Sequence, residues 1–381
     1  MKKFSLRISD IPVSIKASHF QRKEGPEEFH IAIYPYKLAD LDTQIRWVYR
    51  AYIEILNYVG IDIKSAIFCR FFLSDIVNQM EVIKNSALYS DISKYSSTSI
   101  ICQPPGPSAK IALWSYHIND KNRPLNKTKD SNSLMLRQDG IIHYWTSGLT
   151  CPEEKTIYEQ TLYILEKYND FLNTHGMSLK DNVIRTWFFI QNIDINYREF
   201  VKARREYYEK AGLSKDTHFI ASTGIQGSSK DILSKVTMDT YAISGLKQTQ
   251  IQFLSAPEYL SPTYVYGVTF ERGTAISYRD RKHIFLSGTA SIDNKGNILY
   301  QGDVIRQLDR TLINIEALLK KAGANLKDIA IFIVYVRDPS DFSIVVKKMR
   351  QKFKDTPIIT VYASVCRPGW LVEIECLAIT P

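Results

Sequence analysis

The sequence Ala322-Gly323-Ala324-Asn325-Leu326-Lys327-Asp328 decides the fold, because related stretches occur at residues 59–65 and 175–181. The glycines of the three copies, at positions 60, 176 and 323, are separated by 116 and 147 residues. The same offsets superpose residues that precede each glycine: Gln44, Gln160 and Gln307, and Leu56, Leu172 and Leu319. One register that holds without a gap indicates an internal repeat. The chain therefore consists of three related units in tandem.

Each copy predicts the same order of elements. An amphipathic helix precedes the glycine, which stands where a helix C-terminal glycine is expected. The apolar stretches that follow predict buried strands at residues 66–73, 183–190 and 329–336. A second amphipathic segment comes next, at residues 342–353 in the third copy, and closing strands are predicted at 109–117, 233–243 and 370–379. This pattern predicts an α/β (α+β) fold.

Polar stretches at residues 119–133 and 247–262 separate the copies. We therefore expect units at residues 1–125, 133–246 and 262–381, the first divergent and the third carrying most of the site. Linkers this short favour a pseudo-trimer within one chain over three separate domains on a string. Because such a ring is already closed, we expect a monomer.

Composition narrows the classes of function. The 381 residues include 49 Lys and Arg against 40 Asp and Glu, a net charge of +9 without a block of five like charges. This argues against a nucleic-acid-binding tail and favours a small anionic ligand, because a cleft lined by one sign of charge attracts the other. The longest apolar run, residues 329–336, is too short to span a membrane, and the first residues do not resemble a signal peptide. We expect a cytoplasmic protein without membrane contact.

Neither a metal nor a cofactor is indicated by the motifs. The five cysteines include no Cys-x-x-Cys pair, and the seven histidines include no His-Glu-x-x-His pattern. A phosphate-binding loop, a Gly-x-Ser-x-Gly turn and a dinucleotide fingerprint are also absent from the sequence.

The last predicted strand carries two acidic residues on one face. Alternation places Glu373 and Glu375 opposite the core-facing residues of the same strand. In a lone domain this face would meet solvent, where surface glutamates are common. In a ring of three units it borders a cleft, where burial and a neighbouring carboxylate raise the pKa of a glutamate towards the range of a general acid.

Several further residues are candidates for a ligand site. Arg367, in a turn at residues 365–369, can hold a carboxylate through two hydrogen bonds or can be a surface charge. Arg272 follows a tyrosine-rich segment. This segment can contribute to a ligand site, or it can be an edge strand packed by its aromatic side chains. The small residues at 287–291 follow an apolar strand and can hold an anion with backbone N–H groups. Residues 221–227 align with 363–369 at a constant offset of 142, which predicts the same turn in the second unit.

The third unit resembles the Rid/YjgF superfamily. Its matching features are a strand ending in Ser287-Gly288, an amphipathic helix, the motif at 322–328 and a last strand Val372-Glu373-Ile374-Glu375. Within that superfamily, the chain is similar to the chorismatases through motifs in all three units: Gln103-Pro104-Pro105, Ala221-Ser222-Thr223-Gly224-Ile225, Ser261-Pro262-x-Tyr264-x-Tyr266-Gly267-x-x-Phe270-x-Arg272-Gly273, Ser287-Gly288-Thr289-Ala290-Ser291-Ile292 and Val365-Cys366-Arg367-x-x-x-Leu371-x-Glu373-Ile374-Glu375. The resemblance implies a trimer-like arrangement with ligand clefts between units.

The resemblance also implies an enzyme that cleaves chorismate to pyruvate and a hydroxybenzoate, 3-hydroxybenzoate with or without 4-hydroxybenzoate, and that needs no cofactor. It implies that Glu373 protonates the enolpyruvyl group, with Glu375 as the alternative acid. Arg272 and Arg367 would hold the substrate carboxylates, and Tyr266 would orient the ring hydroxyl. The remaining implied contacts are Thr223, Gly288, Thr289, Ala290, Ser291, Cys366 and Glu375, of which Ala290 and Cys366 border the ring and influence the product.

Two positions depart from these patterns. Simple Rid imine deaminases carry a substrate arginine fifteen residues before the first glutamate of the last strand, and here that residue is Ile358. Glu271 stands where chorismatases are expected to have a small polar residue. Three other functions stay open: a chorismate hydrolase that forms a dihydroxycyclohexadiene carboxylate, a Rid-type imine or enamine deaminase, and a metabolite-binding protein without catalytic activity.

Overall fold

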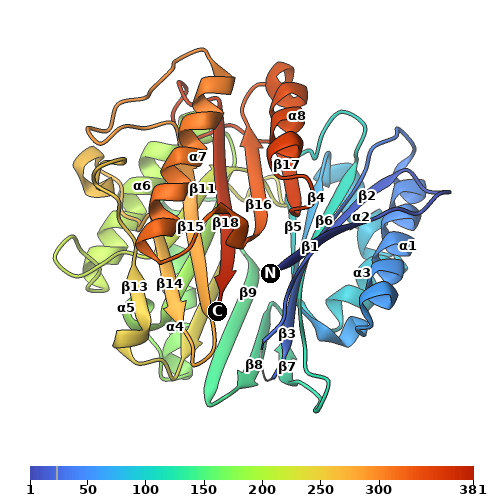
Figure 1. The fold of residues 1–381 in the computed structure, drawn as a ribbon. Coiled ribbons are helices and arrows are strands. Elements are labelled where there is room, and N and C mark those ends of the chain that lie inside the picture. The colour runs from blue at the N-terminus through green and yellow to red at the C-terminus, as the bar shows by residue number, and fades with distance from the viewer. Residues whose placement is uncertain (23–24) are drawn as a thin grey trace.

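The computed structural model describes residues 1–22 and 25–381, with all of their side chains except that of Tyr266. Within these residues the chain forms three six-stranded mixed sheets, each built from one contiguous stretch and covered by helices (Figure 1). The predicted α/β (α+β) fold of three tandem units is therefore confirmed. Among the described helices, none is both long enough and apolar enough to cross a bilayer.

The elements of the three units are as follows. The first contains β1 (Lys2–Leu6), β2 (Val13–Phe20), β3 (Glu27–Pro35), α1 (Leu41–Val59), β4 (Ala66–Leu73), α2 (Ile76–Lys84), α3 (Ala87–Ser93), β5 (Ser97–Cys102) and β6 (Ile111–Asn119). The second contains β7 (Asn126–Asp130), β8 (Ser133–Gln138), β9 (Ile141–Leu149), α4 (Ile157–Thr174), α5 (Leu179–Asn182), β10 (Val183–Ile190), α6 (Ile193–Lys210), β11 (Ala221–Gln226) and β12 (Val236–Ser244). The third contains β13 (Ile251–Phe253), β14 (Gly273–Ser277), β15 (Lys282–Ala290), α7 (Val304–Lys321), β16 (Ile329–Val336), α8 (Phe342–Lys352), β17 (Ile358–Tyr362) and β18 (Val372–Thr380).

The three sheets share one strand order. The first runs β1-β2-β3-β6-β4-β5, the second β7-β8-β9-β12-β10-β11 and the third β13-β14-β15-β18-β16-β17. In each, the closing strand (β6, β12 or β18) lies inside the sheet. The registers also agree, since the first residue of each closing strand pairs with the last residue of β4, β10 or β16. Equivalent positions in the three units can therefore be assigned residue by residue.

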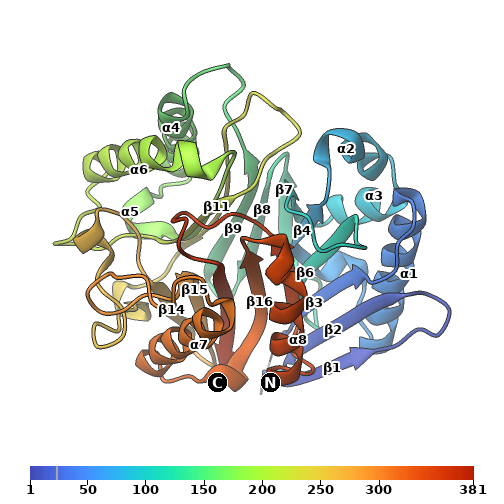
Figure 2. The ribbon, with the colours of Figure 1, turned by 90° about the horizontal axis from the view of Figure 1, so that it is seen from above.

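The units form a closed ring. The edge strand β5 of the first unit contacts β9 of the second, β11 contacts β15 of the third, and β17 contacts β3 of the first. These are three equivalent contacts, because β5, β11 and β17 hold the same place in their sheets. Figure 2 shows the sheets gathered at the centre with the helices outside. This arrangement confirms the predicted internal pseudo-trimer.

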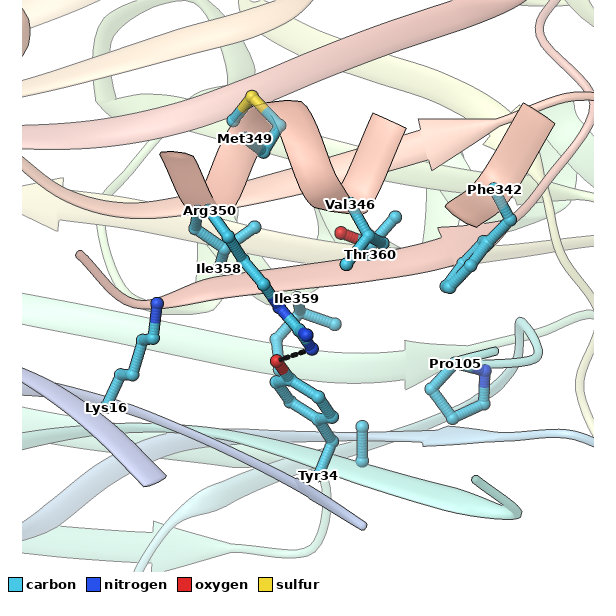
Figure 3. Close-up of a pocket in the computed structure, with 11 residues that line it drawn as sticks. Lys16, Tyr34, Pro105, Phe342, Val346, Met349, Arg350, Ile358, Ile359 and Thr360 are labelled. Atoms are coloured by element: carbon cyan, nitrogen blue, oxygen red, sulfur yellow. Dashed lines mark hydrogen bonds between the residues drawn. The ribbon is translucent and has the colours of Figure 1, made fainter. Parts of the chain in front are cut away.

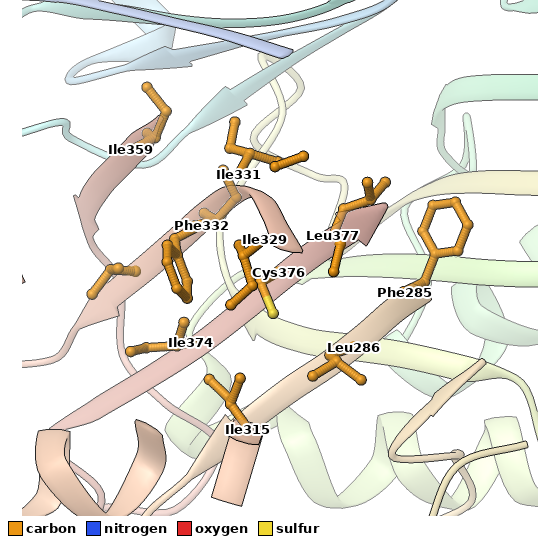
Figure 4. Close-up of a cluster of buried hydrophobic side chains, with 14 of the residues drawn as sticks. Phe285, Leu286, Ile315, Ile329, Ile331, Phe332, Ile359, Ile374, Cys376 and Leu377 are labelled. Atoms are coloured by element: carbon orange, nitrogen blue, oxygen red, sulfur yellow. The ribbon is translucent and has the colours of Figure 1, made fainter. Parts of the chain in front are cut away.

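Helix α7 illustrates how the sequence builds each unit. The Asp303 side chain caps its first turn by accepting from the backbone N–H of Arg306. Its apolar residues at spacings of three and four are buried against the sheet, and Ile315 faces β15 and β18 in Figure 4. After the helix ends, Gly323 adopts a φ of +76°, a left-handed conformation that favours glycine.

The predicted strands at residues 66–73, 183–190 and 329–336 are confirmed at both ends as β4, β10 and β16. Two strands, β7 and β13, lie in stretches that the sequence suggests as connections between copies. The prediction that residues 221–227 repeat the turn at 363–369 is wrong. Residues 221–226 form β11, which pairs in parallel with β10 as β17 pairs with β16, so β17 is its counterpart.

Candidate active site

A small cavity lies between the second and third units, beside the contact of β11 with β15. The second unit contributes Tyr197, Arg204, Ser222, Thr223 and Gly224, and the third contributes Val268, Phe270, Arg272, Gly288, Ala290, Ile292, Cys366, Arg367, Trp370 and Glu373. Its volume is about 30 Å³, room for about two or three water molecules. A larger ligand must therefore displace side chains as it enters.

Glu373 reaches this cavity because of how β18 pairs with β15. The ladder shifts between Leu286 and Thr289, which places a β-bulge at Ser287 and Gly288. A Cβ atom on Gly288 would overlap the Oε1 atom of Glu373 and lie 2.8 Å from its carboxyl carbon. The glycine therefore makes room for the carboxyl group.

The environment of Glu373 favours its neutral form. Its side chain is buried, with 5% of the residue surface exposed. Burial, followed by the charge of Glu375, raises the pKa of Glu373 to about 8, against the opposing effects of Arg185 and Arg272. The direction agrees with the sequence-based expectation. At neutral pH most of this side chain is a carboxylic acid, which can donate a proton.

Glu375 lies behind the cavity wall and is held by three hydrogen bonds. Its Oε2 atom accepts hydrogen bonds from Arg185 Nη2 at 2.6 Å and Thr223 Oγ1 at 2.5 Å, and its Oε1 atom accepts from Trp187 Nε1 at 3.0 Å. Donors of the second unit therefore occupy the carboxyl oxygens of Glu375, whereas Glu373 lines the cavity. The arrangement favours Glu373 over Glu375 as the acid.

This buried network includes all three units. Thr223 Oγ1 also accepts from the backbone N–H of Gly288 at 2.9 Å, so the second unit is bonded to the bulge beside Glu373. Arg70 of the first unit pairs with Asp239 of the second at 2.8 Å and lies 3.9 Å from Glu375. The position of Glu373 therefore depends on the assembly of the whole ring.

Three arginines line the cavity. Arg272 is buried and donates to the carbonyl oxygen of Ser261 at 2.9 Å, and Arg367 is partly exposed, with its guanidinium 5.0 Å from the Trp370 ring centroid. Arg204, on α6, is 1% exposed, and its Nε and Nη2 atoms have no hydrogen-bond partner within the described part of the chain. A buried guanidinium with unsatisfied donors suits an anionic ligand.

Arg204 was not among the site residues predicted from the sequence. One signal was present: Arg204 follows Phe200 by four residues, so it lies on the apolar stripe of α6, where an unpaired charge is unexpected. The partner of that stripe depends on how two units pack, which the helix periodicity does not show.

The ring has three equivalent interfaces, but the residues at their equivalent positions differ. Ala112, Thr237 and Glu373 are the second residues of the three closing strands, and each pairs with the equivalent residue of β4, β10 or β16. Only one of these three positions carries a carboxyl group. The fold therefore provides one candidate acid at this position in a scaffold with three similar interfaces.

The remaining candidates divide into two groups. Thr223, Gly288, Ala290, Cys366, Arg272 and Arg367 line the cavity with Glu373. Thr289 and Ser291 are not in its lining; their hydroxyl groups donate to the carbonyl oxygens of Ser287 and Leu299. The side chain of Tyr266 lies outside the described residues. Ile358 lies at the interface of the third and first units. No group of three or more metal-ligating side chains occurs in residues 1–22 and 25–381.

Gly288→Ala is expected to lower activity by roughly 100-fold or more, because the new methyl group displaces the acid from its place in the cavity. Steady-state kinetics on the substrate proposed below measure this loss. Gly224→Ala is the matched control: its Cβ atom finds ordinary contacts of 3.6 Å or more, so the loss should be far smaller. Equal losses in the two variants would contradict the assigned role of Gly288.

The raised pKa of Glu373 predicts a pH-dependent stability. The unfolded chain loses this proton near pH 4.5 and the folded chain near pH 8, so the contribution of Glu373 to stability falls as the pH rises between these values. Glu373→Gln removes the effect and should be more stable than the parent by roughly 3 to 5 kcal/mol at pH 8, and by much less at pH 5. Urea unfolding at both pH values measures the difference. If the difference in the free energy of unfolding between variant and parent did not increase with pH, the raised pKa of Glu373 would be contradicted.

Comparison with known proteins agrees with this architecture. Residues 274–380 match the Endoribonuclease L-PSP family. A RutC family protein of Pyrococcus abyssi is 32% identical over 97 residues, which cover 76% of that protein and 25% of this chain. A 2-iminobutanoate/2-iminopropanoate deaminase of Capra hircus is 32% identical over 98 residues, which cover 72% of it and 25% of this chain. The chain therefore belongs to the RutC family, which corresponds to the Rid/YjgF group, through its third unit.

A solved structure is similar over a much greater length. A crystal structure of a chorismatase superposes with a TM-score of 0.62 and covers 83% of this chain and 93% of that one, at 17% sequence identity. The two proteins share the fold of three tandem units.

Proposed function

We propose that this protein is a chorismatase, which releases pyruvate and a hydroxybenzoate from chorismate. The observation that carries the proposal is a buried carboxylic acid, Glu373, in an inter-unit cavity that also holds Arg204, Arg272 and Arg367. Chorismate carries two carboxylates, and guanidinium groups bind carboxylates well. The acid and the cations are the two features that cleavage of an anionic enol ether requires.

The reaction follows from the position of the acid. Glu373 donates its proton to the methylene carbon of the enolpyruvyl group, which leaves an oxocarbenium ion at the neighbouring carbon. The C4 ring hydroxyl captures this cation and releases its proton, which gives a cyclic ketal. The C4–O bond and the bond from the ketal carbon to the C3 oxygen then break, so pyruvate leaves with the C4 oxygen and the C3 oxygen takes up a proton. The ring loses its C3 proton as it becomes aromatic. Two protons enter and two leave, so Glu373 returns to its acid form. In the hydrolase alternative, water captures the cation and the product is a dihydroxycyclohexadiene carboxylate.

The surrounding residues hold the substrate in this proposal. Arg204 and Arg272 lie deepest, since both are buried, and Arg367 is partly exposed at the edge. Ala290 and Cys366 lie on the walls near Glu373 and would contact the ring, so they are the positions that influence which product forms. Binding the substrate dianion beside Glu373 would further favour the protonated acid.

A single assay tests the proposal. The purified chain is incubated with chorismate, pyruvate is followed with lactate dehydrogenase, and the ring product is identified by chromatography. Pyruvate together with a hydroxybenzoate supports the proposal, whereas the dihydroxy product identifies the hydrolase. Absence of pyruvate would overturn it; hydrolysis of a 2-aminoacrylate-derived imine would then identify a deaminase, and inactivity on both a binding protein.

Arg204→Met is expected to raise the KM for chorismate by roughly 10- to 100-fold, the effect of losing hydrogen bonds to a carboxylate. Arg204→Lys should recover part of the loss because the charge is kept. The neighbouring Arg205 is exposed on the same helix, so Arg205→Met is the matched control and should leave KM near that of the parent. Steady-state kinetics measure all three, and an unchanged KM in Arg204→Met would remove this residue from the site.

A further inference from the structure

A second cavity lies at another interface of the ring, between the first and third units. It is enclosed by Lys16 and Tyr34 from β2 and β3, by one face of α8 and by β17 (Figure 3). Its volume is about 40 Å³, slightly more than that of the cavity beside Glu373. An open depression of about 470 Å³ lies beside it, and the two share Phe342, Val346 and Arg350 in their linings. The two spaces together provide room for a ring.

The strand register makes this cavity the structural counterpart of the catalytic one. Ile358, Ile359 and Thr360 in its wall hold the places that Ser222, Thr223 and Gly224 hold beside Glu373. Ala112 holds the place of Glu373 itself. The cavity therefore lies at the position equivalent to the one beside Glu373 but has no acid in its lining.

Its charged groups lie together at one side. Arg350, exposed at the mouth, donates to the Tyr34 hydroxyl at 2.5 Å, and Lys16, half-buried, donates to the carbonyl oxygen of Lys354 at 2.5 Å. Asp355 is the nearby carboxylate, and it accepts from the Ser5 hydroxyl at 3.0 Å. Among the described lining residues there are two cations and no acid. This edge suits a single carboxylate.

The rest of the cavity is apolar. Phe342 and Met349 of α8 and Ile358 and Ile359 of β17 are buried and line it on the side of the third unit. Phe342 also packs against Tyr362, with ring centroids 4.4 Å apart, so an aromatic surface is already present. A flat apolar ring fits between such residues better than a second charged group does.

We propose that this cavity binds a small aromatic monocarboxylate and does not turn it over. The carboxylate lies between Lys16 and Arg350, and the ring lies against α8 and β17. Such a ligand has two sources, a product of the catalytic cavity or an aromatic acid from outside. Both share the same chemistry of recognition.

Isothermal titration of the full chain with benzoate and with 3-hydroxybenzoate tests the proposal, with benzamide as the uncharged probe. Saturable benzoate binding is expected. It should weaken at least 10-fold in Lys16→Met/Arg350→Met and in Val346→Trp, which fills the mouth, and benzamide should bind at least 10-fold more weakly. Lys348→Met, on the same helix but paired with Asp309, is the matched control and should bind as the parent does.

Arg204→Met tests whether benzoate binds in the catalytic cavity instead. This variant should leave the binding of benzoate unchanged. Loss of benzoate binding in Arg204→Met, or its persistence in Lys16→Met/Arg350→Met, would overturn the proposal, as would the absence of saturable binding. Tighter binding of 3-hydroxybenzoate than of benzoate would support the site and identify the reaction product as its source, and equal binding would support it with an external acid. Pyruvate release is measured separately, so failure of the proposed function does not affect this test.

Discussion

Glu373→Gln is expected to lower the rate of pyruvate release from chorismate by roughly 100- to 10,000-fold, the usual contribution of a general acid. The amide has nearly the same shape as the carboxylic acid but cannot deliver a proton to carbon. Calorimetry should show that the variant still binds chorismate, because the three arginines are unchanged. Loss of rate with binding retained would locate the defect in the chemical step.

If the proposed function holds, the pH dependence of pyruvate release by the parent protein should report the ionisation of Glu373. Because the pKa of Glu373 is about 8 in the folded chain, kcat/KM should fall tenfold per pH unit above that value. Glu316→Gln, a partly exposed position on α7 outside the cavity lining, is the control and should keep the activity of the parent. If Glu373→Gln retained more than a tenth of that activity, Glu373 would not be the acid and the mechanism would have to be abandoned.

A large loss of stability is expected from Arg185→Met, which should lower the free energy of unfolding by about 3 to 5 kcal/mol. The substitution leaves the carboxylate of Glu375 buried without its closest cation, and removing one partner of a buried ion pair costs more than the pair itself contributes. Urea unfolding followed by circular dichroism measures the change. Should Arg185→Met fail to fold, the milder Arg185→Lys keeps the charge and should lose less.

Two comparisons isolate the cause of that loss. Adding Glu375→Leu to Arg185→Met removes the unpaired charge and should recover at least half of the stability. Arg204→Met removes an equally buried arginine that has no ion pair among the described residues, and should cost about 1 kcal/mol or less. A similar cost for both arginines would show that lost packing, and not the unpaired carboxylate, is responsible.

Most of the fold was predictable because it repeats. Three copies of one motif gave the register, and the period-two alternation of the last strand correctly placed both glutamates on the face that meets another unit. The raised pKa of Glu373 followed from that placement. These features depend on local pattern and on the number of copies, and both can be read from the chain.

The misses have a different origin. The small residues at 287–291 were treated as a loop, but 287–290 lie in β15, and alternation after the bulge turns Gly288 and Ala290 to the cavity while Thr289 and Ser291 point away. Residues 221–227 were aligned with the wrong segment, because a constant offset does not follow insertions between elements. Arg204 was missed because its surroundings are created by the packing of two units. The spacing of residues along the sequence does not show which distant segments lie together in the fold.

A trimer of identical chains repeats every residue in all three of its clefts, so a change that suits one cleft is imposed on the others. Here the ring is a single polypeptide, and the positions equivalent to Glu373 hold an alanine and a threonine. Each interface can accumulate substitutions independently of its sisters. Proton-transfer chemistry can then be confined to one interface. The residues at the other two interfaces can change under selection for other roles, such as storage, sensing or assembly.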